Sequence, residues 1–224
     1  MRSIFTFALY FFMEDNYKHK GIRKQLAALL KTKGIKNLQV LQAIEAVPRH
    51  LFLDSSFLEF AYQDKAFPIG AGQTISQPYT VAFQTELLEI VKGEKVLEVG
   101  TGSGYQTAVL CFMGAKVFTI ERQKTLFDKT KLFLPSVGYN AKFFYGDGYK
   151  GIPAFAPYDK IIVTAGAPVI PAALLAQLKE GGKLVIPVGD GKGQEMYSLV
   201  KNQNNFEQTN HGSFKFVPLL EQKA

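Results

Sequence analysis

The stretch that decides the fold runs from Val96 to Tyr105 and reads VLEVGTGSGY. Its first half is apolar and aliphatic around one acidic residue, which predicts a strand buried on both faces. Its second half is a glycine-rich turn, and the residues from Gln106 to Met113 are compatible with a helix that begins directly after it. Such a turn lets a ligand approach the backbone, and the start of the helix presents unpaired N–H groups. The stretch therefore predicts a ligand site at the carboxyl end of a strand.

Short apolar runs of the same kind recur along the chain, separated by segments compatible with helices. They are Lys95–Val99, Lys116–Glu121, Ala141–Gly146, Lys160–Thr164 and Lys183–Val188. This alternation predicts an α/β fold of the Rossmann-like, doubly wound type with a mainly parallel sheet. The tail from Glu195 to Leu219 alternates polar and apolar residues, which predicts antiparallel C-terminal strands at the edge of the sheet.

The residues before the sheet predict a helical N-terminal subdomain. Apolar residues at helical spacing indicate two helices between residues 17 and 47, and residues 66–80 are rich in Gly, Pro, Thr, Ser and Gln, which indicates a loop. We expect a single domain over residues 13–224, in which residues 13–80 form a helical and loop cap and residues 81–224 form the ligand-binding core.

The first twelve residues form an apolar extension that the rest of the pattern does not explain. The apolar stretch from Ile4 to Phe12 is too short to span a bilayer, which takes about 20 residues. It also lacks the small-residue cleavage site of a signal peptide before Glu14. Because the amphipathic pattern begins only after Met13, we expect translation to start there; the alternative is an ordered hydrophobic extension.

Composition narrows the class of protein. With 224 residues, 47% of them hydrophobic, the chain can bury one substantial core. The net charge of +7 comes from scattered Lys and Arg, which indicates a solvated basic surface. The single cysteine, Cys111, excludes an intramolecular disulfide and fits a reducing compartment. We therefore expect a cytoplasmic protein without a metal and without a nucleic-acid or membrane partner, and we separately expect a monomer.

The glycine spacing separates two classes of nucleotide site. A dinucleotide fingerprint reads G-x-G-x-x-G, whereas Gly100, Gly102 and Gly104 form G-x-G-x-G. Glu98, at the end of the predicted strand, would repel a pyrophosphate but could face the cationic part of S-adenosyl-L-methionine. The pattern favours S-adenosyl-L-methionine over NAD.

Two more acidic residues end neighbouring predicted strands. Glu121 could accept hydrogen bonds from both hydroxyls of a ribose, and Asp147, within Gly146-Asp147-Gly148, could meet the adenine amino group. Taken singly, Glu121 could be a surface charge and Asp147 part of an Asp-Gly turn. Because the carboxyl ends of parallel strands meet at one edge of a sheet, the acidic residues together predict one cofactor pocket.

Eight motifs occur in an order that resembles the bacterial form of the protein-L-isoaspartate O-methyltransferase family. They are VPRHLF (47–52), PIG (68–70), GQTISQP (72–78), EVGTGSG (98–104), GDG (146–148), IIVTA (161–165), VIPVG (185–189) and FVPL (216–219). The resemblance extends from about residue 17 to residue 220, and GQTISQP is specific to that family rather than common to methyltransferases. Tyr149 departs from it, since the bacterial family often carries tryptophan there; both residues are aromatic.

The resemblance implies transfer of a methyl group from S-adenosyl-L-methionine to the free carboxylate of L-isoaspartyl and D-aspartyl residues in damaged proteins and peptides. Ser76 matches the family's active-site serine. The implied substrate-binding residues are Gln73, Thr74, Ile75, Ser76, Val217 and Leu219. The cofactor-binding residues, by position in the motifs, are Glu98, Gly100, Thr101, Gly102, Gly104, Glu121, Asp147 and Gly148.

A carboxylate acceptor needs no catalytic base. With a reference pKa of about 4 it is already ionised at neutral pH, so Ser76 is expected to orient the acceptor by hydrogen bonding. Two alternatives stay open: a methyltransferase that acts on RNA or a small molecule, and a non-catalytic S-adenosyl-L-methionine-binding module. The stretch from Thr164 to Ala167 stands where amino-group methyltransferases favour Asn-Pro-Pro-Tyr, and its small residues favour a carboxylate acceptor.

Overall fold

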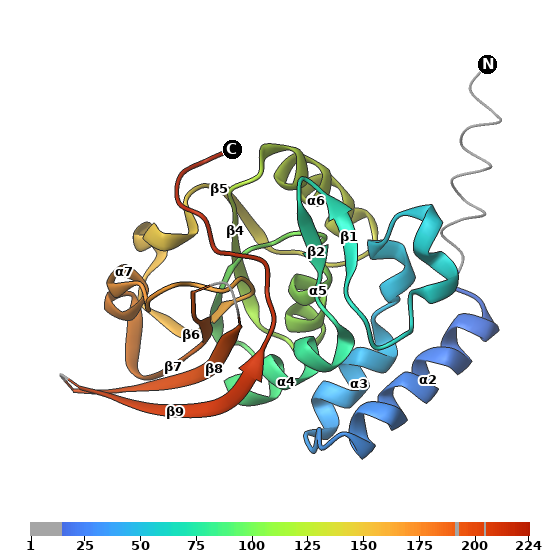
Figure 1. The fold of residues 1–224 in the computed structure, drawn as a ribbon, viewed down its shortest axis with the longest axis horizontal. Helices are drawn as coiled ribbons and strands as arrows, with labels where there is room; N and C mark the ends of the chain where they lie inside the picture. Colours follow the sequence, from blue (N-terminus) through green and yellow to red (C-terminus); the bar gives the residue numbers. More distant parts are fainter. Residues whose placement is uncertain (1–14, 191–192, 204) are drawn as a thin grey trace.

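The computed structural model describes residues 15–190, 193–203 and 205–224, and its centre is a seven-stranded sheet (Figure 1). The strands are β3 (Lys95–Val99), β4 (Lys116–Glu121), β5 (Lys142–Tyr145), β6 (Tyr158–Val163), β7 (Leu178–Val188), β8 (Gln194–Asn202) and β9 (Asn205–Phe214). Their order across the sheet is β5-β4-β3-β6-β7-β8-β9, and the chain order reverses between β3 and β6. Ligands of doubly wound folds bind outside the carboxyl ends of the strands at such a reversal.

The sheet confirms the predicted fold class. The five strands from β5 to β7 are parallel, and β8 and β9 pair antiparallel with their neighbours. Strands β3 and β4 have the predicted bounds. Strand β7 begins at Leu178 rather than Lys183, because its pairing with β6 passes through an irregularity between Tyr158 and Lys160 and takes in a polar, glycine-containing segment that has no strand pattern.

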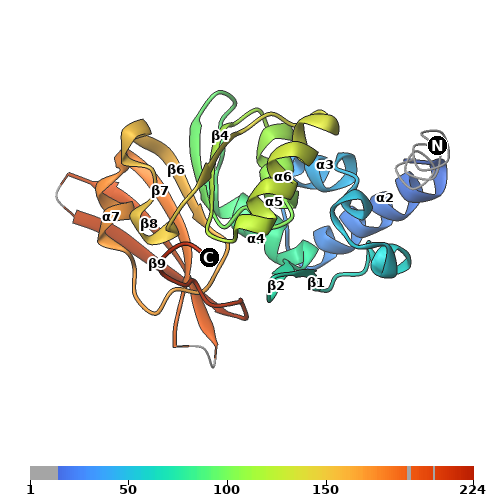
Figure 2. The same ribbon diagram turned by 90° about the horizontal axis from the view of Figure 1, so that it is seen from above.

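Helices cover both faces of this sheet. They are α2 (Tyr17–Thr32), α3 (Leu38–Ala46), α4 (Pro78–Leu88), α5 (Tyr105–Phe112), α6 (Lys124–Ser136) and α7 (Ala172–Ala176). Figure 2 shows α4, α5 and α6 on one side of the sheet and α7 on the other. Within β3, Val96 packs with Leu110 of α5 and Leu97 packs in the cluster that contains Leu174 of α7. The alternation of side chains along a strand thus buries β3 on both faces.

The predicted loop over residues 66–80 is wrong in part. Strands β1 (Phe67–Gly70) and β2 (Gln73–Ile75) form an antiparallel hairpin, and α4 already begins at Pro78. Ala71 and Gly72 have φ angles of 51° and 67°, as in the two-residue turns with positive φ that suit hairpins. Residues typical of turns occupy the strands themselves here, which is why composition alone indicated a loop.

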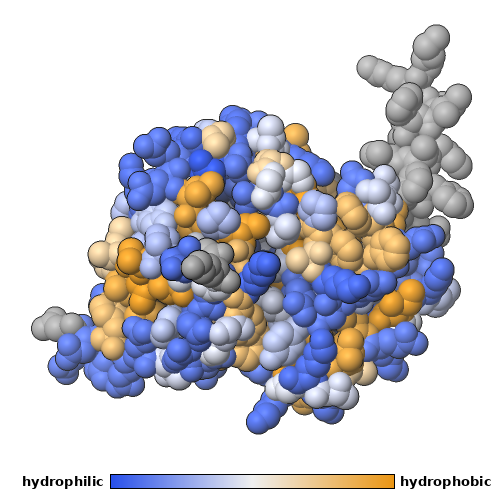
Figure 3. All heavy atoms as spheres, in the orientation of Figure 1, coloured by the Kyte–Doolittle hydropathy of each residue, from blue (hydrophilic) through white to orange (hydrophobic). Residues whose placement is uncertain are grey.

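The described part of the predicted cap, residues 15–80, shares one apolar cluster with the sheet domain. Leu30 of α2 and Ile44 of α3 lie in the same cluster as Val81 of α4 and Val109 of α5. The boundary at residue 80 stays a prediction, and the predictions for residues 1–12 and for the start at Met13 lie outside the described residues. Within the described ranges, no helix is both long and apolar enough to cross a membrane. Figure 3 shows hydrophilic side chains over much of one face, with hydrophobic ones in separate patches.

Candidate active site

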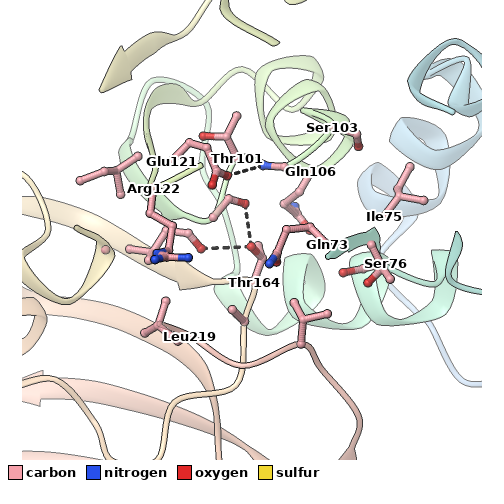
Figure 4. Close-up of a pocket in the computed structure, with 18 of the residues that line it drawn as sticks. Gln73, Ile75, Ser76, Thr101, Ser103, Gln106, Glu121, Arg122, Thr164 and Leu219 are labelled. Atoms are coloured by element: carbon pink, nitrogen blue, oxygen red, sulfur yellow. Dashed lines mark hydrogen bonds between the residues drawn. The ribbon is translucent and has the colours of Figure 1, made fainter. Parts of the chain in front are cut away.

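A pocket lies at the carboxyl ends of β3, β4 and β6, between the β1–β2 hairpin and the C-terminal segment 217–220 (Figure 4). Its lining includes eleven of the residues predicted from sequence. These are Gln73, Thr74, Ile75, Ser76, Gly100, Thr101, Gly102, Glu121, Gly148, Val217 and Leu219. The sheet edge therefore brings together the glycine-rich turn and the GQTISQP segment, which lie about 25 residues apart in the sequence.

The glycine-rich turn has a backbone that only glycine adopts without strain. Gly100 has a φ of +97°, and a Cβ atom built there would lie 2.4 Å from the side-chain hydroxyl of Thr164. Gly104 has a φ of +85°, and a Cβ atom there would lie within 3 Å of Thr130 and Leu134 on α6. Gly100 thus keeps the turn close to β6, and Gly104 lets α6 pack against the start of α5.

Glu121 is held at the pocket edge by the turn itself. Its Oε2 accepts a hydrogen bond from the Gly102 N–H at 2.9 Å, and its Oε1 accepts one from the Gln123 N–H at 2.8 Å. Each carboxylate oxygen can accept a second hydrogen bond. In Figure 4, Glu121 and Arg122 lie on one side of the pocket, and Gln73 and Ser76 lie on the other. The carboxylate is therefore positioned to accept hydrogen bonds from ligand hydroxyls.

Gln106, on α5, is a pocket residue that the motif does not mark. Its amide nitrogen donates to the Thr85 hydroxyl at 2.9 Å, while its side-chain oxygen is buried and has no hydrogen-bond partner among the described residues. A buried acceptor without a donor costs free energy. The Gln106 oxygen therefore suits a ligand that brings an N–H donor, such as an ammonium group.

Glu98 lies elsewhere than predicted. Its Oε2 accepts a hydrogen bond from the Thr107 hydroxyl of α5 at 2.5 Å, and the side chain is fully buried. Burial raises its pKa to about 8, against the opposing effect of the hydrogen bonds from Thr107 and Thr119. Because side chains alternate along β3, Val99 faces the pocket and Glu98 faces α5. As far as the described residues go, Glu98 is not part of the pocket lining.

Gly104 and Asp147 also lie beside the pocket rather than in its lining, as far as the described ranges extend. Gly104 is the residue before α5 and contacts α6, as described above. Asp147 accepts a hydrogen bond from the Tyr149 N–H at 2.9 Å and lines a neighbouring hollow that shares Ile120 with the pocket. The two hollows adjoin at Ile120, so an elongated ligand in the pocket could extend past Ile120 toward Asp147.

Thr164 is a pocket residue whose role sequence reasoning missed. Its hydroxyl lies 2.7 Å from the Gly100 carbonyl and 3.0 Å from the Val99 carbonyl, as the dashed lines in Figure 4 indicate. The sequence does contain a signal for this role, because Thr164 directly follows β6, the strand beside β3. The hydroxyl ties the end of β6 to the glycine-rich turn.

The pocket is narrow, with a cavity volume of about 70 Å³. Small-molecule sites have volumes of roughly 300–1,000 Å³. The pocket as it stands is therefore smaller than ligand sites usually are. Ile69 on β1 approaches Gly102 closely, since a Cβ atom at Gly102 would lie 3.3 Å from its side chain.

A group of possible metal ligands lies outside the pocket but does not suit an ion. Asp15, His19 and His50 offer atoms within 4.8 Å of one another. Both carboxylate oxygens of Asp15 already accept hydrogen bonds from the Arg23 guanidinium, at 2.5 and 2.8 Å. The two imidazole rings stack face to face, with centroids 3.9 Å apart and planes inclined at 27°, rather than converging edge-on as the ligands of one ion do. The group is better described as a packed ion pair with stacked rings.

Residues 21–224 match the family model described as protein-L-isoaspartate(D-aspartate) O-methyltransferase. The chain belongs to this family. A family member from Flavobacterium psychrophilum, a protein-L-isoaspartate O-methyltransferase, is 64% identical over 212 residues, which are 94% of this chain and 100% of the relative. One from Christiangramia forsetii has the same identity and coverage.

Solved structures of the family have the same architecture. A protein-L-isoaspartate O-methyltransferase structure is 30% identical with a TM-score of 0.80, covering 88% of this chain and 65% of that one. A Plasmodium falciparum structure, assigned to the same activity and solved with S-adenosyl-L-homocysteine, is 27% identical with a TM-score of 0.76, covering 88% and 98%. The family likeness therefore extends over both the cap and the sheet described above.

Proposed function

We propose that this chain transfers a methyl group from S-adenosyl-L-methionine to the free carboxylate of L-isoaspartyl residues, and of D-aspartyl residues, in damaged proteins and peptides. The observation that carries the proposal is the shared pocket: Ser76 and its neighbours on β2 line the same cavity as the glycine-rich turn and Glu121. Membership of the family supports the acceptor, and the Plasmodium falciparum relative with S-adenosyl-L-homocysteine supports the cofactor.

The pocket residues fit the cofactor on two independent grounds. The Glu121 carboxylate, fixed by the N–H groups of Gly102 and Gln123, has acceptor capacity left for ribose hydroxyls. The unpartnered oxygen of Gln106 suits the ammonium group of the methionine part. When bound, S-adenosyl-L-methionine supplies an electrophilic methyl group, so that a carboxylate oxygen gains the methyl, the sulfur keeps the bonding electron pair, and a methyl ester and S-adenosyl-L-homocysteine result.

The residues around the acceptor act by orienting it and by excluding water. Among the described residues that line the pocket there is no histidine or cysteine, and none is required, because the acceptor carboxylate is already ionised at neutral pH. Ser76 is half-buried and its hydroxyl can donate a hydrogen bond to the acceptor or its peptide group. Correct placement of reacting atoms lowers barriers by about 7–11 kcal/mol in well-oriented systems.

Glu98 contributes to this site indirectly. Its carboxyl group receives a hydrogen bond from Thr107 and so fixes α5 against β3, next to the turn that α5 follows. We assign it the role of a positioning residue rather than a cofactor contact. Asp147 is assigned the adenine contact at the far end of an elongated ligand, beyond Gly148. We place the activity in the cytoplasm, which the single cysteine supports, and we propose that the enzyme acts as a monomer.

The test of the catalytic assignment is Ser76→Ala. We expect turnover of an isoaspartyl peptide to fall about 10- to 100-fold, as for loss of one orienting hydrogen bond, while the Kd for S-adenosyl-L-homocysteine changes less than twofold. Ser136→Ala is the matched control, because Ser136 is exposed at the end of α6 and its hydroxyl donates only to the Phe133 carbonyl at 2.7 Å. Unchanged turnover of Ser76→Ala would refute the role of Ser76.

A further inference from the structure

The pocket continues beyond Ser76 into two further hollows on the surface. A small hollow adjoins the pocket and shares Thr74, Ser76, Thr164 and Val217 with it. That hollow in turn shares Gln77, Thr80 and Lys215 with an outer groove. The reaction site is therefore the inner end of a track that runs out between the start of α4 and the end of β9, where Figure 1 shows the two elements close together.

The outer groove is lined with aromatic rings. Tyr79 and Phe83 of α4 lie with ring centroids 6.5 and 5.1 Å from that of Phe214, and the ring of His211 meets Phe83 edge-on at 6.2 Å. Tyr79, Phe83 and Phe214 are each only half-buried, so part of their surface faces the groove. The groove is open and has a volume of about 740 Å³, within the range of about 300–1,000 Å³ for ligand sites.

One charged side chain stands where the track narrows. Lys215 is exposed and lines both the small hollow and the outer groove, and within the described ranges the groove lining contains no acidic residue. Lys215 therefore supplies a positive charge at this point, while two acidic side chains outside the lining, Glu195 and Asp64, accept hydrogen bonds from lining residues. A peptide with a hydrophobic side chain for the groove and an acidic group near Lys215 is complementary to it.

We propose that this groove binds the polypeptide segment on one side of the reactive isoaspartyl residue, and that it favours a large hydrophobic side chain with an acidic neighbour. The inference rests on the proposed function. A carboxylate methylated beside Ser76 belongs to a chain that must leave the pocket, and the track past Thr80 and Lys215 leads from Ser76 into the aromatic groove. The rings then bury apolar surface of the substrate, which strengthens substrate binding without changing the methyl-transfer step itself.

A second hollow near the pocket does not offer an equivalent path. It lies between β1 and α6 and shares only Ser103 with the pocket, on the side of the glycine-rich turn and away from Ser76. Ile69 and Gly102, which approach each other closely, lie between this hollow and the pocket. The aromatic groove is therefore the better site for the flanking segment.

The experiment compares methylation of four isoaspartyl peptides by the full chain. The first is the tripeptide Gly-isoAsp-Gly. The second carries Glu-Phe-Ala after the tripeptide, and the third carries Ala-Phe-Glu before it. The fourth carries three alanines on whichever side gives the lower KM with phenylalanine. We expect one of the two phenylalanine peptides to have a KM about tenfold lower than both the tripeptide and the alanine peptide, with a similar kcat.

Two groove variants and their controls complete the test. Phe214→Ala is expected to abolish the tenfold advantage while leaving kcat and KM for the tripeptide unchanged, and the exposed Phe112→Ala is its control. Lys215→Glu, which cannot disturb the core because Lys215 is exposed, is expected to raise the KM of the Glu-containing peptide about two- to fivefold at low salt only. Lys131→Glu on α6, also exposed, is the charge-matched control.

The outcomes separate the groove from the proposed function. If the tripeptide is methylated but neither extension lowers the KM, or if the advantage persists unchanged in both groove variants, the groove proposal is overturned and the proposed function stands. If none of the isoaspartyl peptides is methylated, the proposed function itself fails, and the groove proposal fails with it.

Discussion

Replacing Gly100 with alanine perturbs the turn at its closest contact with β6. A Cβ atom there would lie 2.4 Å from the Thr164 hydroxyl oxygen and 3.8 Å from the Thr164 Cβ, and the φ of Gly100 is +97°. Two separate costs follow. One is the backbone strain of a non-glycine residue at positive φ, and the other is the collision with the hydroxyl, which breaks its hydrogen bonds to the Gly100 and Val99 carbonyls.

The two costs differ in size, and only the collision can be relieved by a second substitution. The backbone strain is about 1–2 kcal/mol and does not depend on Thr164. The collision adds about 1–3 kcal/mol, and removing the hydroxyl with Thr164→Ala relieves it, because the remaining Cβ lies at ordinary contact distance. We therefore expect Gly100→Ala to lower the free energy of unfolding by about 2–5 kcal/mol. The double variant Gly100→Ala/Thr164→Ala recovers about 1–3 kcal/mol of that loss, a clear departure from additivity.

The assay is urea denaturation of the wild type, both single variants and the double variant, together with titration of S-adenosyl-L-homocysteine. Gly138→Ala is the matched control, since Gly138 has a φ of +88° and an added Cβ would have no atom within 4 Å. It isolates the strain alone, about 1–2 kcal/mol. If the losses in free energy of unfolding of the two single variants add up to that of the double variant within about 0.5 kcal/mol, the collision is refuted, and with it the explanation of why this turn carries Gly100.

Two further predictions concern the acidic residues. Glu98 has a pKa of about 8 in the folded chain, against 4.5 when unfolded, so the folded state holds a proton that the unfolded state loses between those values. Urea denaturation of the wild type and of Glu98→Gln at several pH values tests this. Relative to the variant, the free energy of unfolding of the wild type should fall by about 1 kcal/mol per pH unit between pH 5 and 8. If the free energies of unfolding of the two proteins change in parallel with pH, the buried, protonated carboxyl group is contradicted. Glu121→Gln should raise the Kd for S-adenosyl-L-homocysteine about tenfold in calorimetric titration, because a hydrogen bond to a charged group is lost. Glu195→Gln, which does not line the pocket, is the control. An unchanged Kd would remove Glu121 from the cofactor site.

The strands and the pocket edge were predictable because one physical rule governs each. Buried parallel strands read as apolar runs, and β3 and β4 therefore have the bounds that their sequences indicate. The carboxyl ends of such strands share one edge, so the predicted meeting of Gly100, Glu121 and Gly148 in one pocket follows from topology alone. The GQTISQP segment reached the same pocket only through the family resemblance.

What escaped prediction depends on side-chain direction and on contacts between distant segments. Glu98 and Glu121 both stand at or near strand ends, but the alternation of side chains turns Glu98 toward α5 while Glu121 borders the pocket. The hairpin of β1 and β2 depends on a two-residue turn whose composition looks like that of a loop. The aromatic groove joins Tyr79 to Phe214, which no local pattern connects.

The most direct test of the central claim uses a pair of peptides identical in sequence, one with an L-isoaspartyl and one with a normal L-aspartyl linkage, incubated with the chain and S-adenosyl-L-methionine. Mass spectrometry should detect addition of a single methyl group to the isoaspartyl peptide, with one S-adenosyl-L-homocysteine formed per methyl transferred, and no addition to the aspartyl peptide. Equal methylation of both peptides, or of neither, would contradict the account.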